Sequence, residues 1–351
     1  MSYRIAINGY GRIGQSVLRA IYTGPHRHLF QVVAINELTD IDTLSYLTRY
    51  DTTHGRFPLP VDLDRQDLLI DADRIGVLQE RDPHNLPWRE LDIDMVFECS
   101  GSFDDRATAE VHLASGARRI LLSHPANPDM DATVVFGVND HLLRPEHRIV
   151  SNASCTTNCI VPILHLLDQT LGIDYGVITT VHSAMNDQPV IDCCHNTNLR
   201  LTRSALQSII PVDTGLSRGI GRILPHMERR FQCLHLRVPT INVSLMDLSV
   251  NVKTTTSAEE INQLVRQAST GPFKGLIGYT REPNASVDFT TDPHSAIVDA
   301  TQTRVSGPRL VKLICWFDNE WGFANRMLDV GARWLSLTSM AGPDSLSHDE
   351  T

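Results

Sequence analysis

The chain has 351 residues, of which 42% are hydrophobic and 21% charged. This length fits about two domains, and the composition is that of an ordinary globular protein with enough apolar residues for a core. The formal net charge of −10 argues against a general nucleic-acid-binding protein, which needs a basic surface. No apolar run in the sequence approaches the ~20 residues that a membrane-spanning helix requires.

The cysteines and the N-terminus bear on the cellular compartment. There are seven cysteines, an odd number without framework spacing, so we expect free thiols in a reducing compartment. Residues 1–5 run directly into a strand-like segment and lack the apolar stretch of a signal peptide, which favours a cytoplasmic protein. Neither Cys193-Cys194 nor Cys155 with Cys159 has the second half of a zinc ligand set, so no metal is expected.

The first part of the chain alternates strand-like and helix-like segments. Strands are expected at residues 4–8, 31–36, 95–98 and 119–122. Helices are expected at residues 15–22, 42–49 and 106–115. Such alternation is typical of a parallel, doubly wound α/β sheet, which we assign to residues 1–154.

The pattern changes after Val150, where the strand-like segments become longer and alternate in polarity. They lie at residues 176–182, 234–239, 242–253, 295–299 and 310–318. This predicts an α+β domain over residues 155–318, with a mostly antiparallel sheet covered by helices on one face. A final helix at 319–336 is expected to pack back on the first domain, followed by a polar, frayed tail at 337–351.

Three glycines follow the first predicted strand in the pattern Gly9-x-Gly11-x-x-Gly14. A strand precedes them, a helix follows, and Glu37 stands at the end of the next strand. This context favours a Rossmann dinucleotide site over a purely structural turn. Glu37 can accept hydrogen bonds from ribose hydroxyls and would repel a 2′-phosphate, which favours NAD over NADP.

Residues 151–159 read Ser-Asn-Ala-Ser-Cys-Thr-Thr-Asn-Cys, between a β-rich run at 147–150 and a helix-compatible run at 160–167. A thiol at a strand-to-helix turn meets unpaired N–H groups and the positive end of the helix dipole, which favour a thiolate. Cys155 is therefore a candidate nucleophile, with a structural thiol in a helix cap as the alternative.

A nucleophilic cysteine needs a base, and His182, at the end of a strand-like run, is the candidate among 15 histidines. A cysteine combined with a dinucleotide site suggests aldehyde oxidation through a thiohemiacetal and a thioester, with the hydride leaving to the nicotinamide.

These motifs together resemble those of the glyceraldehyde-3-phosphate dehydrogenase family. The resemblance rests on residues 8–14, 50–55, 151–159, 237–240 and 316–322, and it covers nearly the whole chain in order up to about residue 335. It implies a catalytic Cys155 with His182 as general base, and a homotetramer that acts on a small aldose phosphate, without nucleic acid or membrane partners.

The resemblance also implies two sets of binding residues. Those near the cofactor NAD would be Gly9, Gly11, Arg12, Ile13, Gly14, Glu37, Arg81, Ser100, Ser123 and Asn319. Those at the substrate or phosphate would be Ser154, Thr156, Arg200, Thr214, Gly215 and Arg237. Without the resemblance, Arg237 would be interpreted as an ordinary strand-edge arginine.

The chain departs from the family pattern after His182. The family usually has threonines three and five residues after this histidine, whereas this chain has Met185 and Asp187. Methionine cannot donate to phosphate and a carboxylate repels it, so one of two anion sites is expected to be altered.

The run 182–188, with residues 123–125 and 209–214, resembles the erythrose-4-phosphate dehydrogenase branch of the family. That branch oxidises D-erythrose 4-phosphate to 4-phospho-D-erythronate, a step toward pyridoxal phosphate in bacteria. We therefore expect this reaction, with product release by hydrolysis. The alternatives are a phosphorylating glyceraldehyde-3-phosphate enzyme and, in a different class, a non-catalytic NAD-binding regulator.

Overall fold

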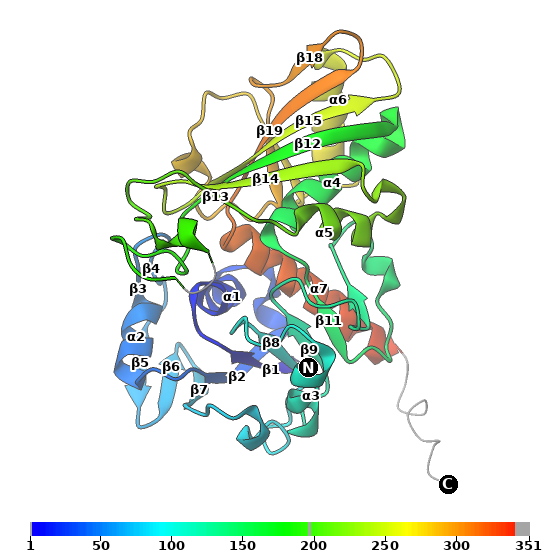
Figure 1. Cartoon of the computed structure of the whole chain (residues 1–351). Helices are drawn as coiled ribbons and strands as arrows, with labels where there is room; N and C mark the ends of the chain where they lie inside the picture. The colour runs from blue at the N-terminus through cyan, green and yellow to red at the C-terminus, as the bar shows by residue number, and fades with distance from the viewer. Residues whose placement is uncertain (1, 196–197, 341–351) are drawn as a thin grey trace. The chain divides into compact units, whose positions relative to one another are not determined.

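The computed structural model describes residues 2–195 and 198–340, whose helices and strands are drawn in Figure 1. The chain divides into two compact units. The first unit contains the chain up to Ala153 together with the segment from Ala324 onward, and the second is Ser154–Phe323.

The described residues of the first unit form a nine-stranded sheet in the order β10-β11-β9-β8-β1-β2-β7-β6-β5, and a hairpin of β3 and β4. The strands are β1 (Tyr3–Asn8), β2 (Phe30–Asn36), β3 (Tyr50–Asp51), β4 (Gly55–Arg56), β5 (Val61–Asp64), β6 (Asp67–Ile70), β7 (Asp73–Leu78), β8 (Met95–Glu98), β9 (Ile120–Leu122), β10 (Ala132–Thr133) and β11 (Ile149–Ser151). The helices are α1 (Arg12–Thr23), α2 (Ile41–Arg49) and α3 (Arg106–Ala114), with the 3₁₀ turns η1 (Pro25–His28), η2 (Pro83–Asn85) and η3 (Asp140–Leu142).

The middle of this sheet is parallel and buried. β1 pairs with β2 on one side and β8 on the other, and Ile5, Ala6 and Ile7 are fully buried. Burying a side chain such as isoleucine contributes roughly 1.5–3 kcal/mol, which stabilises the centre of the unit. The predicted parallel pairing is confirmed for the expected strands β1, β2, β8 and β9, and it extends to β11 and to β7 and β10, which were not predicted.

One edge of the sheet was not predicted. β5 and β6 are antiparallel to their neighbours, and the chain reverses through Arg65 and Asp71, with φ values of 59° and 54°. These strands are short and carry charged residues, so their sequence lacks the apolar runs that identify the central strands.

The described residues of the second unit form a sheet in the order β13-β14-β12-β15-β19-β17-β16, with β18 paired to β19. The strands are β12 (Ile173–His182), β13 (Ile210–Val212), β14 (Phe231–Arg237), β15 (Ser244–Val252), β16 (Ile277–Thr280), β17 (Ala296–Asp299), β18 (Arg304–Ser306) and β19 (Leu310–Phe317). The helices are α4 (Cys155–Leu171), α5 (Leu216–Ile223) and α6 (Ala258–Thr270), with η4 (Leu199–Thr202), η5 (Pro225–Met227) and η6 (Ser286–Phe289).

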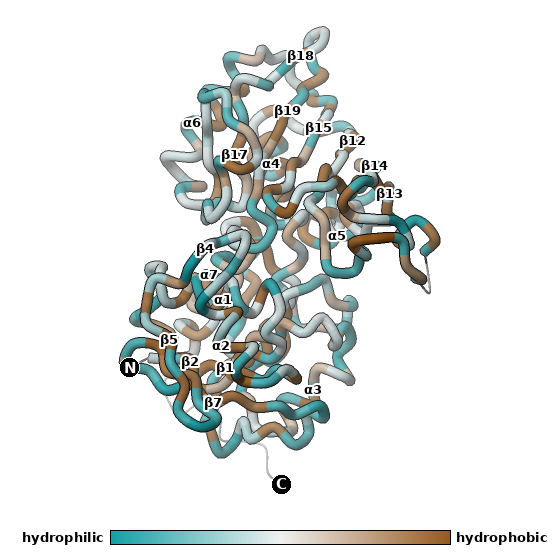
Figure 2. Tube along the Cα trace, turned by 90° about the vertical axis from the view of Figure 1, so that its left-hand side faces the viewer, coloured by the Kyte–Doolittle hydropathy of each residue, from teal (hydrophilic) through white to brown (hydrophobic). Residues whose placement is uncertain are grey.

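This second sheet is mostly antiparallel, as predicted; β12–β14 and β16–β17 are its parallel pairs. Every second residue of β15 is buried, because α4 packs against β12 and β15 on one face and α5 packs against β14. Figure 2 shows hydrophobic segments along the strands β15 and β19. The opposite face carries exposed Tyr175, Val177 and Leu234.

The last helix, α7 (Trp321–Met340), begins in the second unit and continues in the first. The Asp318 side chain caps its first turn, since Asp318 Oδ1 accepts a hydrogen bond from the Trp321 N–H at 2.8 Å. Within the first unit, Tyr3 Oη donates to the Leu335 carbonyl at 3.2 Å. The helix runs past the predicted end at residue 336, so 337–340 of the predicted tail are helical, and 341–351 lie outside the described residues.

All seven cysteines are free thiols. Within residues 2–195 and 198–340, no helix is long and apolar enough to cross a membrane. In the same ranges, no group of three or more His, Cys, Asp or Glu side chains is arranged to hold a metal ion.

Candidate active site

Cys155 is the first residue of α4. β11 ends at Ser151, and the chain then turns through Ala153, whose φ of 56° lies in the left-handed region. Ser154 caps the helix, since its Oγ accepts the Thr157 N–H at 3.1 Å. The predicted strand-to-helix turn at the thiol is therefore confirmed, and it places the thiol beside the N–H groups of the first helical turn.

His182, the last residue of β12, is buried and lies beside this thiol. The distance from Cys155 Sγ to His182 Nε2 is 3.7 Å. On the other side of the ring, Nδ1 is 2.8 Å from the Ser183 carbonyl oxygen. A carbonyl can only accept, so Nδ1 carries the hydrogen and the lone pair of Nε2 faces the sulfur. His182 is thus oriented to receive the thiol proton.

Burial shifts the pKa of both groups in the direction that favours their neutral forms. Burial raises the pKa of the Cys155 thiol to about 11, although the Thr156 N–H and the Arg237 charge act in the opposite direction. Burial also lowers the pKa of His182 to about 4. The thiolate expected from the helix N-terminus is not favoured here, because the loss of solvation outweighs the N–H groups and the dipole.

Arg237, the last residue of β14, lies opposite His182 in the register of the parallel pair β12–β14. Its Nη1 donates to Asp187 Oδ1 at 3.0 Å and to Gln188 Oε1 at 3.3 Å. Asp187, where the family pattern has a threonine, therefore forms an ion pair with the arginine that we expected to bind phosphate. The sequence identified Asp187 as a departure but did not identify this partner.

Two more of the predicted substrate residues, Ser154 and Thr156, adjoin Cys155, and their hydroxyl oxygens are 3.0 Å apart. Thr214 and Gly215 lie at the start of α5, which packs against α4. Arg200 is in η4 and is exposed. Among the described residues, no hydrogen bond links the side chain of Arg200 or Thr214 to the others in this set.

A second candidate site lies in the first unit, at the carboxyl ends of its parallel strands. A cavity of about 420 Å³ opens there. Five predicted cofactor residues line it: Gly9, Gly11, Glu37, Arg81 and Ser100. Glu37 Oε2 accepts the Tyr10 N–H at 2.7 Å and Oε1 accepts the Leu38 N–H at 2.7 Å, so its carboxylate is held beside the glycine turn.

A buried polar network that the sequence did not predict supports the wall of this cavity. Glu98, at the end of β8, is fully buried and accepts hydrogen bonds from Asn8 Nδ2 and from the N–H and hydroxyl of Ser100. His112 Nε2 also faces this carboxylate at 3.0 Å, and its Nδ1 accepts from Trp88 at 3.1 Å. The network fixes Asn8 and Ser100, both of which line the cavity.

Two family profiles match the chain. The one described as "Glyceraldehyde 3-phosphate dehydrogenase, NAD binding domain" matches residues 3–106, and the one described as "Glyceraldehyde 3-phosphate dehydrogenase, C-terminal domain" matches residues 154–319.

The chain belongs to the glyceraldehyde-3-phosphate dehydrogenase family. It is an NAD-dependent dehydrogenase with a Rossmann domain and an α+β domain, as predicted. NAD is its cofactor.

The cavity fits this family's cofactor. A Cβ at Gly9 would lie 2.5 Å from the Ser100 nitrogen, and one at Gly14 would lie 2.2 Å from the Gly9 oxygen, so both positions require glycine. A Cβ at Gly11 would meet no atom within 4 Å, which leaves open space where a pyrophosphate can approach the start of α1.

The remaining predicted cofactor residues do not line this cavity. Arg12 forms a two-pronged ion pair with Asp51, at 2.9 Å and 3.2 Å, so a contribution from this position would come from its backbone at the start of α1. Ile13 and Gly14 belong to the same first turn of α1. Ser123 follows β9, and its N–H donates to the Glu98 carbonyl.

Asn319 lies in the second unit. Its Oδ1 accepts from Ser183 Oγ at 3.0 Å and from Ser244 Oγ at 2.8 Å, so its amide is held beside the residue that follows His182.

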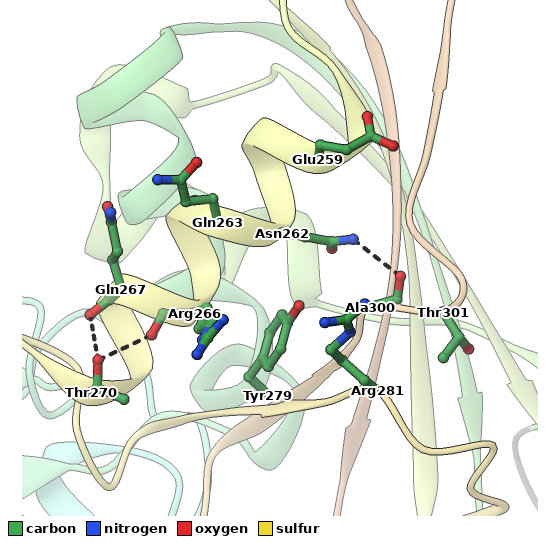
Figure 3. A pocket seen from close by; sticks show the side chains of 10 residues that line it. All are labelled: Glu259, Asn262, Gln263, Arg266, Gln267, Thr270, Tyr279, Arg281, Ala300 and Thr301. Atoms are coloured by element: carbon green, nitrogen blue, oxygen red, sulfur yellow. Dashed lines mark hydrogen bonds between the residues drawn. The ribbon is translucent and has the colours of Figure 1, made fainter.

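A larger cavity, of about 690 Å³, lies on the second unit between α6 and β16. Figure 3 shows Arg266, Tyr279 and Arg281 on its wall, with Asn262 donating to the Ala300 carbonyl. It contains none of the predicted site residues, so size alone does not identify the reacting centre of this family member.

Proposed function

We propose that this family member uses NAD to oxidise D-erythrose 4-phosphate to 4-phospho-D-erythronate, and that water releases the product. In bacteria this reaction is a step toward pyridoxal phosphate. The observation that carries the proposal is the ion pair between Asp187 and Arg237. A phosphorylating enzyme must hold the phosphate of its substrate and an attacking inorganic phosphate, whereas hydrolysis needs only the first.

The charges near the thiol support a single phosphate. Asp187 is 45% exposed at its side chain and offsets the charge of Arg237, and Met185 offers no donor. Two dianionic phosphates bound beside Arg237 would be attracted by this one arginine and repelled by the Asp187 carboxylate. Like charges at such short range are costly, so a second phosphate is disfavoured.

The residues of the catalytic domain can carry the chemistry as follows. Cys155 Sγ attacks the aldehyde carbon, and its proton moves to His182 Nε2. The N–H groups at the start of α4 are available to the oxygen that gains charge. His182 then releases the thiol proton to solvent. In the release step, Nε2 takes a proton from water as the water attacks the thioester carbon, and it passes that proton to the departing sulfur of Cys155.

Bound NAD would supply the hydride acceptor for the oxidation of the hemithioacetal carbon to a thioester. Gly9, Gly11, Glu37, Arg81 and Ser100 would hold it. The balanced reaction consumes one aldehyde, one water and one NAD⁺, and it yields one carboxylic acid, one NADH and one proton, with a second proton lost when the acid ionises.

The test is to follow NADH formation and to analyse the product with erythrose 4-phosphate and with glyceraldehyde 3-phosphate, each with and without inorganic phosphate. We expect a higher kcat/KM for erythrose 4-phosphate and a free acid as product under both conditions. An acyl phosphate product, or strict dependence on added phosphate, would favour the phosphorylating alternative. If neither substrate leads to NADH formation, the non-catalytic NAD-binding regulator is favoured.

A double variant sharpens this test. Met185→Thr with Asp187→Thr restores the family pattern, and we expect it to gain phosphate-dependent turnover. Asp62→Thr, which removes an exposed carboxylate in the NAD-binding domain, is the matched control and should leave product and phosphate dependence unchanged.

The expected homotetramer is part of the same proposal. The outward face of β12 and β14 exposes Tyr175 (63%), Val177 (53%) and Leu234 (46%), and such apolar faces are typical of contacts between subunits. Val177→Glu should lower the molar mass measured by light scattering, whereas Val287→Glu, at an exposed site in η6, should not. A monomeric wild-type protein would contradict the proposal.

A further inference from the structure

His235 is a buried histidine of the catalytic domain that the reaction described above does not use. It lies two residues before Arg237 in β14, on the same face of the strand, and only 8% of it is exposed. Its ring stacks on that of His182, with centroids 5.0 Å apart and planes at 24°. His235 therefore contacts the general base and also neighbours the residue at the candidate anion site.

The hydrogen bond between His235 and Arg237 has a defined direction. Arg237 Nε is 3.2 Å from His235 Nε2, and a guanidinium N–H can only donate. His235 Nε2 is consequently the acceptor, and its ring is neutral with the hydrogen on Nδ1. Burial, together with the neighbouring His182 and Arg237, lowers the pKa of His235 to about 3, so the acceptor persists at neutral pH.

The remaining contacts of Arg237 show what this bond does. Nη1 donates to Asp187 and Gln188 on the other side. Because a guanidinium is planar, holding both Nε and Nη1 sets the direction of Nη2. Among the described residues, no acceptor is found for Nη2, so this nitrogen remains available to an anion.

We propose that His235 is a positioning residue that holds the Arg237 guanidinium so that Nη2 faces the phosphate of the substrate, and that its ring keeps His182 in place beside Cys155. Taking the anion to be the substrate's phosphate rests on the proposed function. The charged and titratable groups around the stacked rings of His182 and His235 are Cys155, Asp187, Arg237 and Glu320.

Two variants separate the two roles. His235→Phe keeps an aromatic ring against His182 but removes the acceptor for Arg237. His235→Gln keeps an acceptor but removes the ring. We expect H235F to raise KM for the aldose phosphate about tenfold with kcat within about threefold of wild type, since a hydrogen bond to a charged group is lost. We expect H235Q to retain KM and to lose kcat several-fold.

A second measurement does not depend on which aldose is the substrate. Inorganic phosphate should protect Cys155 against alkylation by iodoacetamide, and the dissociation constant from this protection should rise about tenfold in H235F and stay near wild type in H235Q. If the phosphate constants follow this order while erythrose 4-phosphate is not turned over, the role of His235 stands and the proposed substrate fails.

Equal dissociation constants for inorganic phosphate in wild type, H235F and H235Q would overturn the proposal. So would an equal loss of kcat and of phosphate affinity in both variants, because that result indicates a purely structural role. Thermal unfolding checks that each variant folds. If H235F is unstable, His235→Leu removes the same acceptor with a smaller side chain, and the same comparison with H235Q applies.

Discussion

Two groups of buried side chains, the Glu98 network of the NAD-binding domain and the Cys155–His182 pair of the catalytic domain, differ in their hydrogen-bond partners. In the NAD-binding domain, the Glu98 carboxylate accepts from Asn8 and Ser100 and faces His112, and His112 in turn accepts from Trp88. In the catalytic domain, Cys155 Sγ and His182 Nε2 face each other at 3.7 Å, and no other hydrogen-bond partner of Nε2 is found in the part of the chain that the structure describes.

This difference distinguishes a structural group, the Glu98 carboxylate, from reactive groups, the Cys155 thiol and the His182 imidazole. A buried carboxylate with all its donors in place is rigid, because losing any one donor leaves a costly unsatisfied group. A base whose lone pair faces a proton that it can remove is ready for transfer. The four predictions below test this contrast, from the largest expected effect to the smallest.

Cys155→Ala should lower kcat/KM by at least about 10⁴-fold, because the nucleophile is removed. Cys159, one turn further along α4, is fully buried, and burial raises the pKa of its thiol well above the usual range. Cys159→Ala should therefore retain most of the activity. Steady-state rates and unfolding temperatures of the two variants provide the comparison, and equal losses would contradict the assignment of Cys155.

His182→Asn should lower kcat/KM by about 10²–10⁴-fold, as expected for the loss of a general base. Burial lowers the pKa of His182 to about 4, so the neutral base is present above that pH and is lost as pH falls through it. The acid limb of kcat/KM should accordingly lie near pH 4 in the wild type.

The control for this prediction is His165→Asn, which changes a half-buried histidine on α4 and should leave the profile unaltered. Alkylation of Cys155 in the free protein should rise only at alkaline pH. An alkylation midpoint below pH 8 that moves upward in H182N would instead indicate a thiolate–imidazolium pair.

Glu98→Gln should destabilise the protein by about 2–4 kcal/mol, since one buried acceptor becomes a donor that faces other donors. NAD binding should weaken as well, because Asn8 and Ser100 lose their anchor. Glu110→Gln, which removes an exposed carboxylate paired with Arg106, should cost less than about 1 kcal/mol. Urea unfolding and NAD titration measure both effects, and similar values for the two variants would refute the role given to Glu98.

Glu37→Gln tests cofactor choice. In the wild type, the like charge of Glu37 should disfavour a 2′-phosphate by about 2 kcal/mol, so kcat/KM with NADP should be about 30-fold below that with NAD. The amide keeps an acceptor near Tyr10 but removes the charge, and the ratio should fall below about threefold. Glu80→Gln, in the same cavity, is the control, and an equal change there would show a general charge effect.

Much of the fold followed from local patterns. The apolar runs of β1, β2 and β8 and the glycines at 9, 11 and 14 predicted the parallel sheet and its cofactor edge, since a buried parallel strand must be apolar on both faces. The edge strands β5 and β6 and the last turn of α7 did not follow, because short charged strands and helix ends carry little periodic signal.

The sequence by itself determined the chemistry available: a cysteine at a helix start, a histidine at a strand end, and a glycine turn beside an acidic residue. Only the tertiary structure decided the protonation and pairing of these groups. Burial raises the pKa of Cys155 and lowers that of His182, and the parallel register of β12 and β14 places Arg237 opposite His182. In the packed fold, Arg237 also pairs with Asp187, and His235 stacks on His182. Solvation and distance between separate strands depend on the packed fold, so no local pattern could reveal them.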